Sequence, residues 1–98
     1  MASQRAARRL QDLQRRIAAL RDSSRILEEQ ITVWSEAFDD ARLRSLMAET
    51  PQSDKDLAEA RRSFEVAQRE SDRRRLEIDQ LVLERDRLLR EWSPREVS

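Results

Sequence analysis

The sequence contains no glycine, cysteine or histidine, and aromatic residues make up only 4% of its 98 residues. The absence of cysteine excludes disulfides and thiolate metal sites, and the absence of histidine removes the commonest general base and metal ligand. Without glycine, the chain also lacks the residue most often used at positive-φ turns and strand bulges. We therefore expect no enzymatic activity, no cofactor and no metal site.

Long hydrophobic runs are missing as well, since none approaches the roughly 18–20 residues needed to span a bilayer. Arg5, Arg8 and Arg9 are not followed by the apolar segment of a secretory signal, so we expect a cytoplasmic protein. Nineteen of the twenty basic residues are arginine, which we attribute to the codon bias of a GC-rich bacterial genome. Because the formal net charge is zero and no basic face is evident, we do not expect nucleic-acid binding.

The residues that are abundant are alanine, leucine, arginine, glutamate and glutamine, which lose little entropy in a helix. In the first half of the chain, apolar residues recur at alternating steps of four and three over six heptads. A 3.5-residue period of this length is typical of a coiled-coil seam. Its members are Ala6, Leu10, Leu13, Ile17, Leu20, Ser24, Leu27, Ile31, Trp34, Phe38, Ala41, Ser45 and Ala48.

A second stripe with the same period follows in the other half of the chain. Its members are Leu57, Ala60, Phe64, Ala67, Ser71, Arg74, Ile78, Leu81, Arg85, Leu88 and Trp92. Besides Ser45 near the end of the first stripe, four polar residues interrupt the two stripes, namely Ser24, Ser71, Arg74 and Arg85. Such residues could set the register or oligomeric state, or bind an anion between hairpins. The simpler interpretation is that the arginine stems lie along the seam with their charged ends in water.

The two stripes are separated at Pro51, which disfavours helix at the residue before it. Ser53 with Asp56 resembles an N-cap and its acidic partner, while Thr50 followed by Pro51 is a competing cap. We expect one domain over residues 1–98. It comprises a helix over about 3–49, a turn at about 50–53, a helix over about 54–92 and a tail at 93–98.

So short a turn predicts an all-α fold in which the two helices form an antiparallel coiled-coil hairpin. Pairing Ala48 with Leu57 sets the expected register, in which Phe38 faces Ala67 and Leu13 faces Trp92. In this register, residues 1–12 project beyond the second helix.

A two-helix hairpin buries little more than one seam, so chains of this kind usually need a partner for stability. Apolar residues outside the seam support this expectation, namely Ile26, Val33, Met47, Leu83 and Leu89. They favour a further helical partner, most simply a second copy of the chain in a homodimeric four-helix bundle.

Charge is distributed unevenly along the chain. Residues 1–25 carry a net charge of +5, residues 26–60 carry −6 and residues 61–98 carry +1. One end could meet its opposite on a partner, for instance on a second hairpin packed antiparallel. The alternative is a solvated helix surface with an incidental asymmetry, because surface ion pairs contribute little.

Trp34-Ser-Glu36 and Trp92-x-x-x-Glu96 resemble, respectively, the Trp-x-Gly turn and the C-terminal signal of the WXG100 family. Those proteins are small secreted helical hairpins that form four-helix dimers, so the resemblance implies secretion. The chain departs from the family in having no glycine, in placing its turn sixteen residues after Trp34, and in its dense charge.

Ser71 and Arg74 are similar to the central pair of the motif by which an anti-sigma hairpin binds cyclic di-GMP. Ala67, Ile78 and Val82 stand where that motif has glutamate, glutamine and aspartate, so the nucleotide site would be missing.

The acidic residues near the turn resemble the tips of coiled-coil factors that enter RNA polymerase, although helix capping explains them more simply. They are Glu49, Asp54 and Asp56. From the residues, we interpret the chain as a non-catalytic protein-interaction module that self-associates and serves as an adaptor or regulatory subunit. The alternatives are a transcription-associated hairpin and a secreted WXG100-like protein.

Overall fold

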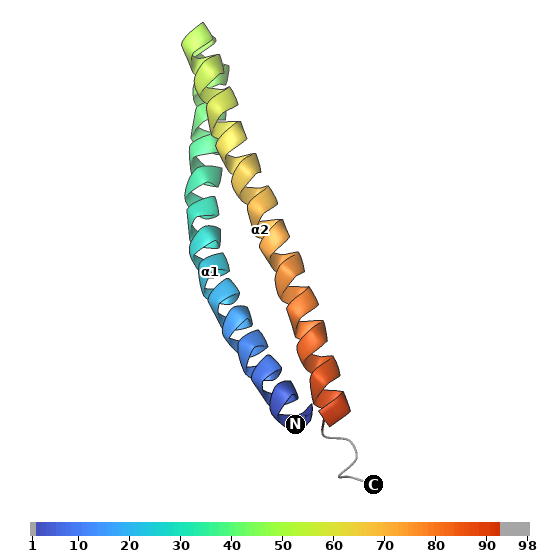
Figure 1. Ribbon diagram of the computed structural model, residues 1–98. Coiled ribbons are helices and arrows are strands. Elements are labelled where there is room, and N and C mark those ends of the chain that lie inside the picture. Colours follow the sequence, from blue (N-terminus) through green and yellow to red (C-terminus); the bar gives the residue numbers. More distant parts are fainter. Residues whose placement is uncertain (1, 93–98) are drawn as a thin grey trace. The chain divides into compact units, whose positions relative to one another are not determined.

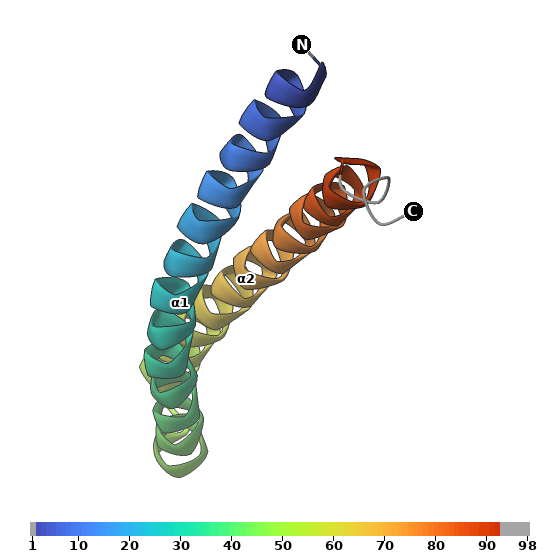
Figure 2. The same ribbon diagram turned by 90° about the horizontal axis from the view of Figure 1, so that it is seen from below.

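The computed structural model describes residues 2–92 and is entirely helical over that range apart from the turn. Helix α1 spans Ala2–Ala48 and helix α2 spans Pro51–Trp92. The two long helices pack against each other in a hairpin-like arrangement (Figures 1 and 2), which confirms the predicted all-α helical hairpin. The predicted tail at 93–98 lies outside the described residues. Within 2–92, neither helix has a stretch long and apolar enough to cross a membrane.

The turn consists of Glu49 and Thr50 alone, so α2 begins three residues earlier than the expected boundary at 54. Thr50 is the N-cap, because its Oγ1 accepts a hydrogen bond of 3.1 Å from the backbone N–H of Ser53. Ser53 returns the bond, since its Oγ accepts from the Thr50 N–H at 3.1 Å. This reciprocal pair satisfies two backbone donors, and Pro51 at the first helical position has no N–H to satisfy.

Glu49 closes α1 in the left-handed region, with φ of 49°, a conformation that favours glycine. Its N–H donates to the carbonyl of Ser45 at 3.0 Å, which holds the last turn of α1 together. Across the turn, the Ser45 hydroxyl donates to Asp54 Oδ1 at 2.7 Å. Asp54 therefore ties the start of α2 to the end of α1, in addition to lying in the positive first turn of its own helix.

Packing divides the helices into two compact units, each built from a segment of α1 and a segment of α2. One unit joins the chain up to Ser23 with the chain from Arg74 onward, and the other comprises Ser24–Arg73. The buried apolar side chains of the first unit are Leu13, Ile17 and Leu20, and those of the second are Leu27, Ala41 and Ala67. Full burial of a leucine or isoleucine side chain contributes roughly 1.5–3 kcal/mol.

The remaining predicted core residues are mostly half-buried. They are Leu10, Ile31, Trp34, Phe38, Leu57, Phe64, Ile78, Leu81 and Leu88. Trp92 differs from the prediction of a core residue, because it is 46% exposed. Leu13, which the predicted register set opposite Trp92, is by contrast 1% exposed.

The observed side-chain contacts correct the predicted register. In the second unit, Phe38 packs on the ring of Phe64, with centroids 5.9 Å apart, where the sequence suggested Ala67. In the first unit, Arg9 binds Glu84 through two hydrogen bonds of 2.7 and 3.0 Å. The expectation that residues 1–12 project beyond α2 is therefore wrong. Thr50 rather than Ser53 caps α2, so α2 begins three residues earlier than the predicted register assumed.

The Arg9–Glu84 pair is bidentate, the geometry in which a guanidinium and a carboxylate interact most strongly. Hydrogen bonding to Arg9 holds the pKa of Glu84 below the ordinary value for a glutamate. The same bond raises the pKa of Arg9 further. A second ion pair in this unit joins Arg16 to Glu77 at 2.7 Å.

Replacing Thr50 by alanine should lower the free energy of unfolding by about 1 kcal/mol, because the Ser53 N–H loses its acceptor. Thermal or urea unfolding followed by circular dichroism measures the change. Lys55→Ala, an exposed replacement in the same helical segment, should change stability by much less. Equal effects of the two variants would show that the cap does not define the turn.

Stability should depend on the ionisation of Glu84 at low pH. Because the pKa of Glu84 is lowered in the folded state, its ion pair with Arg9 contributes its full stabilisation above the unfolded-state pKa of about 4.3. This stabilisation is lost as the pH falls through the lower, folded-state pKa of Glu84. Melting temperatures of the wild type and Glu84→Gln should therefore differ at neutral pH and converge as the solution is acidified below about pH 4. A difference that persists unchanged at pH 3 would contradict the ion pair as its source.

Candidate protein interface

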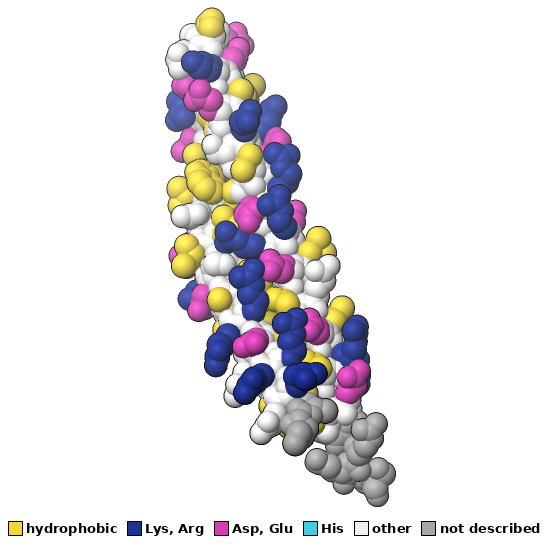
Figure 3. All heavy atoms as spheres, viewed as in Figure 1, with side chains coloured by type: hydrophobic (Ala, Val, Ile, Leu, Met, Phe, Trp, Pro, Cys, Tyr) yellow, Lys and Arg dark blue, Asp and Glu magenta, His cyan; other side chains and the backbone are white. Residues whose placement is uncertain are grey.

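The described residues offer no metal-binding constellation. Within residues 2–92, no group of three aspartate or glutamate side chains is arranged to hold a metal ion. The exposed apolar side chains are the more distinctive feature, and Figure 3 shows such side chains lying between charged ones on the visible face.

All five residues predicted to meet a partner are exposed. Ile26 is 54% exposed, Val33 62%, Met47 85%, Leu83 63% and Leu89 38%. Ile26, Val33 and Met47 belong to the second unit, and Leu83 and Leu89 belong to the first. Large exposed apolar side chains mark an interaction site where they gather in one region.

Sequence reasoning overlooked Val66, which is 50% exposed on α2. Val66 follows the seam residue Phe64 by two positions, just as Val33 follows Ile31 by two. If Ile31 and Phe64 are counted as the first positions of their heptads, both valines hold the third position. This shared position is the signal that could have identified Val66 from the sequence. Leu43 and Leu46, also overlooked, are 57% and 69% exposed near the end of α1.

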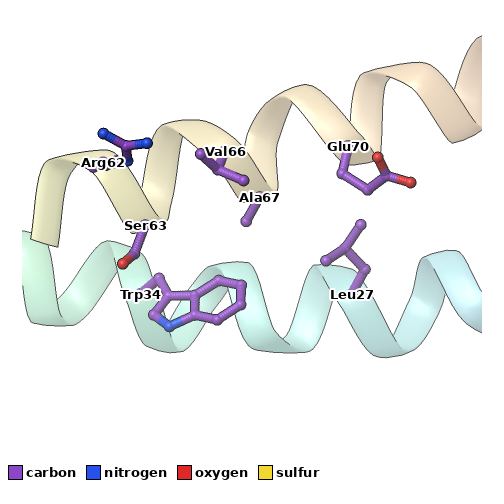
Figure 4. Close-up of a pocket in the computed structure, with 7 residues that line it drawn as sticks. All are labelled: Leu27, Trp34, Arg62, Ser63, Val66, Ala67 and Glu70. Atoms are coloured by element: carbon purple, nitrogen blue, oxygen red, sulfur yellow. The ribbon is translucent and has the colours of Figure 1, made fainter. Parts of the chain in front are cut away.

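A groove of about 410 Å³ lies between the helices within the second unit. Figure 4 shows Leu27 pointing from α1 toward α2 and the Trp34 ring lying along α1 across from Ala67. The α2 residues that complete the lining are Arg62, Ser63, Val66, Ala67 and Glu70. Because Ser63 and Ala67 are small, they leave the indole of Trp34 partly uncovered. Trp34 is therefore a groove residue as well as a seam residue.

Below the groove, toward the turn, Phe38 is flanked by cations as well as by Phe64. The guanidinium carbon of Arg42 lies 4.8 Å from the centroid of the Phe38 ring, and that of Arg61 lies 5.7 Å from it. Both distances are within the range of cation–π attraction. These contacts cover the Phe38 ring between the Trp34 groove and the turn.

A second groove of about 480 Å³ follows the outer face of α2 toward the turn. It is lined by Lys55, Ala58, Glu59, Arg61, Arg62 and Glu65. Arg62 belongs to both grooves, so they follow one another along α2. The lining changes from mainly charged in this second groove to mainly apolar around Val66.

The four polar seam residues differ in their surroundings. Arg74 donates from Nη1 to the backbone carbonyl of Ser23 at 3.0 Å, and Arg85 pairs with its neighbour Asp86 at 3.0 Å. Ser71 is buried, with 4% of its surface exposed. The buried hydroxyl of Ser24 has no hydrogen-bond partner among the described residues. The arginines are therefore bound within the hairpin, whereas Ser24 is an unsatisfied polar group in the seam.

Comparison of the chain with known protein families, with curated proteins and with solved structures gives no match.

Removing the Ser24 hydroxyl should not weaken the hairpin. A buried hydroxyl without a partner costs about 1 kcal/mol or more, so Ser24→Ala should leave the melting temperature unchanged or raise it. Ser53→Ala is the matched control, because its hydroxyl is bonded to Thr50 and its loss should destabilise. A lower melting temperature for Ser24→Ala would show that the hydroxyl has a partner in the assembled protein.

Proposed function

We propose that the chain is a non-catalytic protein-interaction module whose antiparallel hairpin self-associates, most simply as a homodimer that forms a four-helix bundle. In this proposal it acts in the bacterial cytoplasm as an adaptor or regulatory subunit. The single observation that carries the proposal is the set of large apolar side chains exposed outside the seam.

The antiparallel arrangement is supported by contacts inside each unit. In the first unit, Arg9 binds Glu84 and Arg16 binds Glu77, so the partner numbers fall on α2 as they rise on α1. In the second unit, Phe38 contacts Phe64 and Ser45 contacts Asp54, in the same sense. Opposite net charges of segments 1–25 and 26–60 would also favour an antiparallel second copy.

Sedimentation at micromolar concentration tests the proposal. The wild type should sediment as a dimer or larger species, and Ile26→Glu combined with Val33→Glu should weaken assembly while keeping most of the helical signal. The matched control is Gln14→Glu combined with Arg21→Glu, two exposed positions that are also seven residues apart on α1. A stable wild-type monomer, or equal loss of assembly in the control, would refute the proposal.

A further inference from the structure

The outer face of α2 carries a charge pattern that is antisymmetric about Val66. Arg62 and Glu70 lie four residues before and after Val66, and Glu59 and Arg73 lie seven residues before and after it. Each position therefore has its opposite charge at the same distance on the other side of the valine. Steps of three and four residues keep all five side chains along one side of the helix.

An antisymmetric pattern is self-complementary when the helix meets a second copy of itself antiparallel. If Val66 meets Val66 of the other copy, Arg62 faces Glu70 and Glu59 faces Arg73, each pair occurring twice. This is the requirement for an isologous interface, in which the same surface patch is used on both subunits. A parallel pairing in the same register would place like charges opposite each other.

Helix α1 offers an exposed apolar residue at the same level. Val33 lies fifteen residues before the end of α1 at Ala48, and Val66 lies fifteen residues after the start of α2 at Pro51. Because both helices rise about 1.5 Å per residue, the two valines are equally distant from the turn. Because the two valines share a heptad position, they lie on the same flank of an antiparallel pair of helices. A single two-fold axis that relates two copies of the chain can therefore pass beside both valines.

The groove lies at this same level. Leu27 and Trp34 contribute its α1 wall, and Val66 lies between Arg62 and Glu70 on its α2 wall. Apolar side chains at the centre with charged side chains at the rim are the usual arrangement of a protein interface. A partly uncovered tryptophan at the centre is the kind of residue that contributes most to binding.

Ion pairs within α2 account for only part of this pattern. Arg73 donates to Glu70 at 2.7 Å, and such pairs explain why charges alternate along the helix. They do not explain why an exposed valine stands at the centre of the pattern, or why an apolar groove opens beside it.

We propose that a second copy of the chain docks on this face about a two-fold axis beside Val33 and Val66, with Arg62 of each copy facing Glu70 of the other. The proposal rests on the self-association proposed above and specifies its surface. The indole of Trp34 becomes covered in the dimer, and the two turns point in opposite directions.

Cysteine cross-linking tests the position of the axis, because the chain has no native cysteine. Val66→Cys should form a disulfide-linked dimer under mild oxidation, since a residue beside the axis meets its own copy within disulfide range. Leu83→Cys and Met47→Cys, which are at least as exposed in the wild type, should cross-link much more slowly. Circular dichroism of each variant confirms that the helices remain intact.

Charge reversal tests the pairing. Arg62→Glu should raise the dimer dissociation constant about tenfold, because two like-charge contacts replace two ion pairs. Arg62→Glu combined with Glu70→Arg should restore much of the affinity. The two residues are eight positions apart and cannot pair within one helix, so restoration must come from the other copy. Arg21→Glu changes the charge equally outside the surface and should have little effect.

The outcomes separate the two proposals. A wild-type dimer whose Val66→Cys variant cross-links no faster than the controls, or whose double charge variant shows no restoration, would overturn this surface and leave self-association standing. A wild-type monomer would overturn both. Fast cross-linking at position 66 together with charge restoration supports the surface proposed here.

Discussion

Leu13, Ile17, Leu20 and Leu27 retain less than a tenth of their exposure, and they are the large apolar side chains buried to this degree within residues 2–92. They belong to a stripe that repeats every 3.5 residues along α1, so the burial continues along the helix without a break in period. With 41% charged residues and no disulfide, the chain has little else to offset the entropy lost on folding. Helix pairing, the position of the turn and the remaining free surface all depend on this seam.

A seam buries one side of each helix and leaves the other sides exposed, which has consequences for function. Charged residues keep most of the free surface solvated. Exposed apolar side chains are the exceptions, among them Ile26, Val33 and Val66 in the second unit, where Val66 lines the groove beside Trp34. Because a lone hairpin buries so few apolar residues, we propose that the exposed apolar side chains meet a helical partner.

The period of the apolar stripes was sufficient to predict the helices, because the spacing of apolar residues follows the helical repeat. It predicted burial less well: Leu13, Ile17, Leu20 and Leu27 are buried, whereas most other predicted core residues are half-buried and Trp92 is exposed. The register was not predictable in the same way. Thr50 and Ser53 are both good caps, with similar contributions to stability, and the reciprocal bond between them is visible only in the structure. The Trp34 groove could not be predicted for the same reason, because it depends on the register that sets Ser63 and Ala67 across from the indole. Val66 was overlooked because it is a single apolar residue on a charged face.

Intermolecular distances between spin labels test the central claim most directly, namely that two copies meet at the middle of the hairpin. Single labels would be placed in turn at Lys55, Glu59, Ser63 and Arg69 of the full chain. In an antiparallel dimer centred on Val66, the distance between equivalent labels is shortest near that residue and grows by about 3 Å per residue away from it, twice the helical rise. Distances that do not vary with the labelled position, or that are shortest near the turn, would contradict the account.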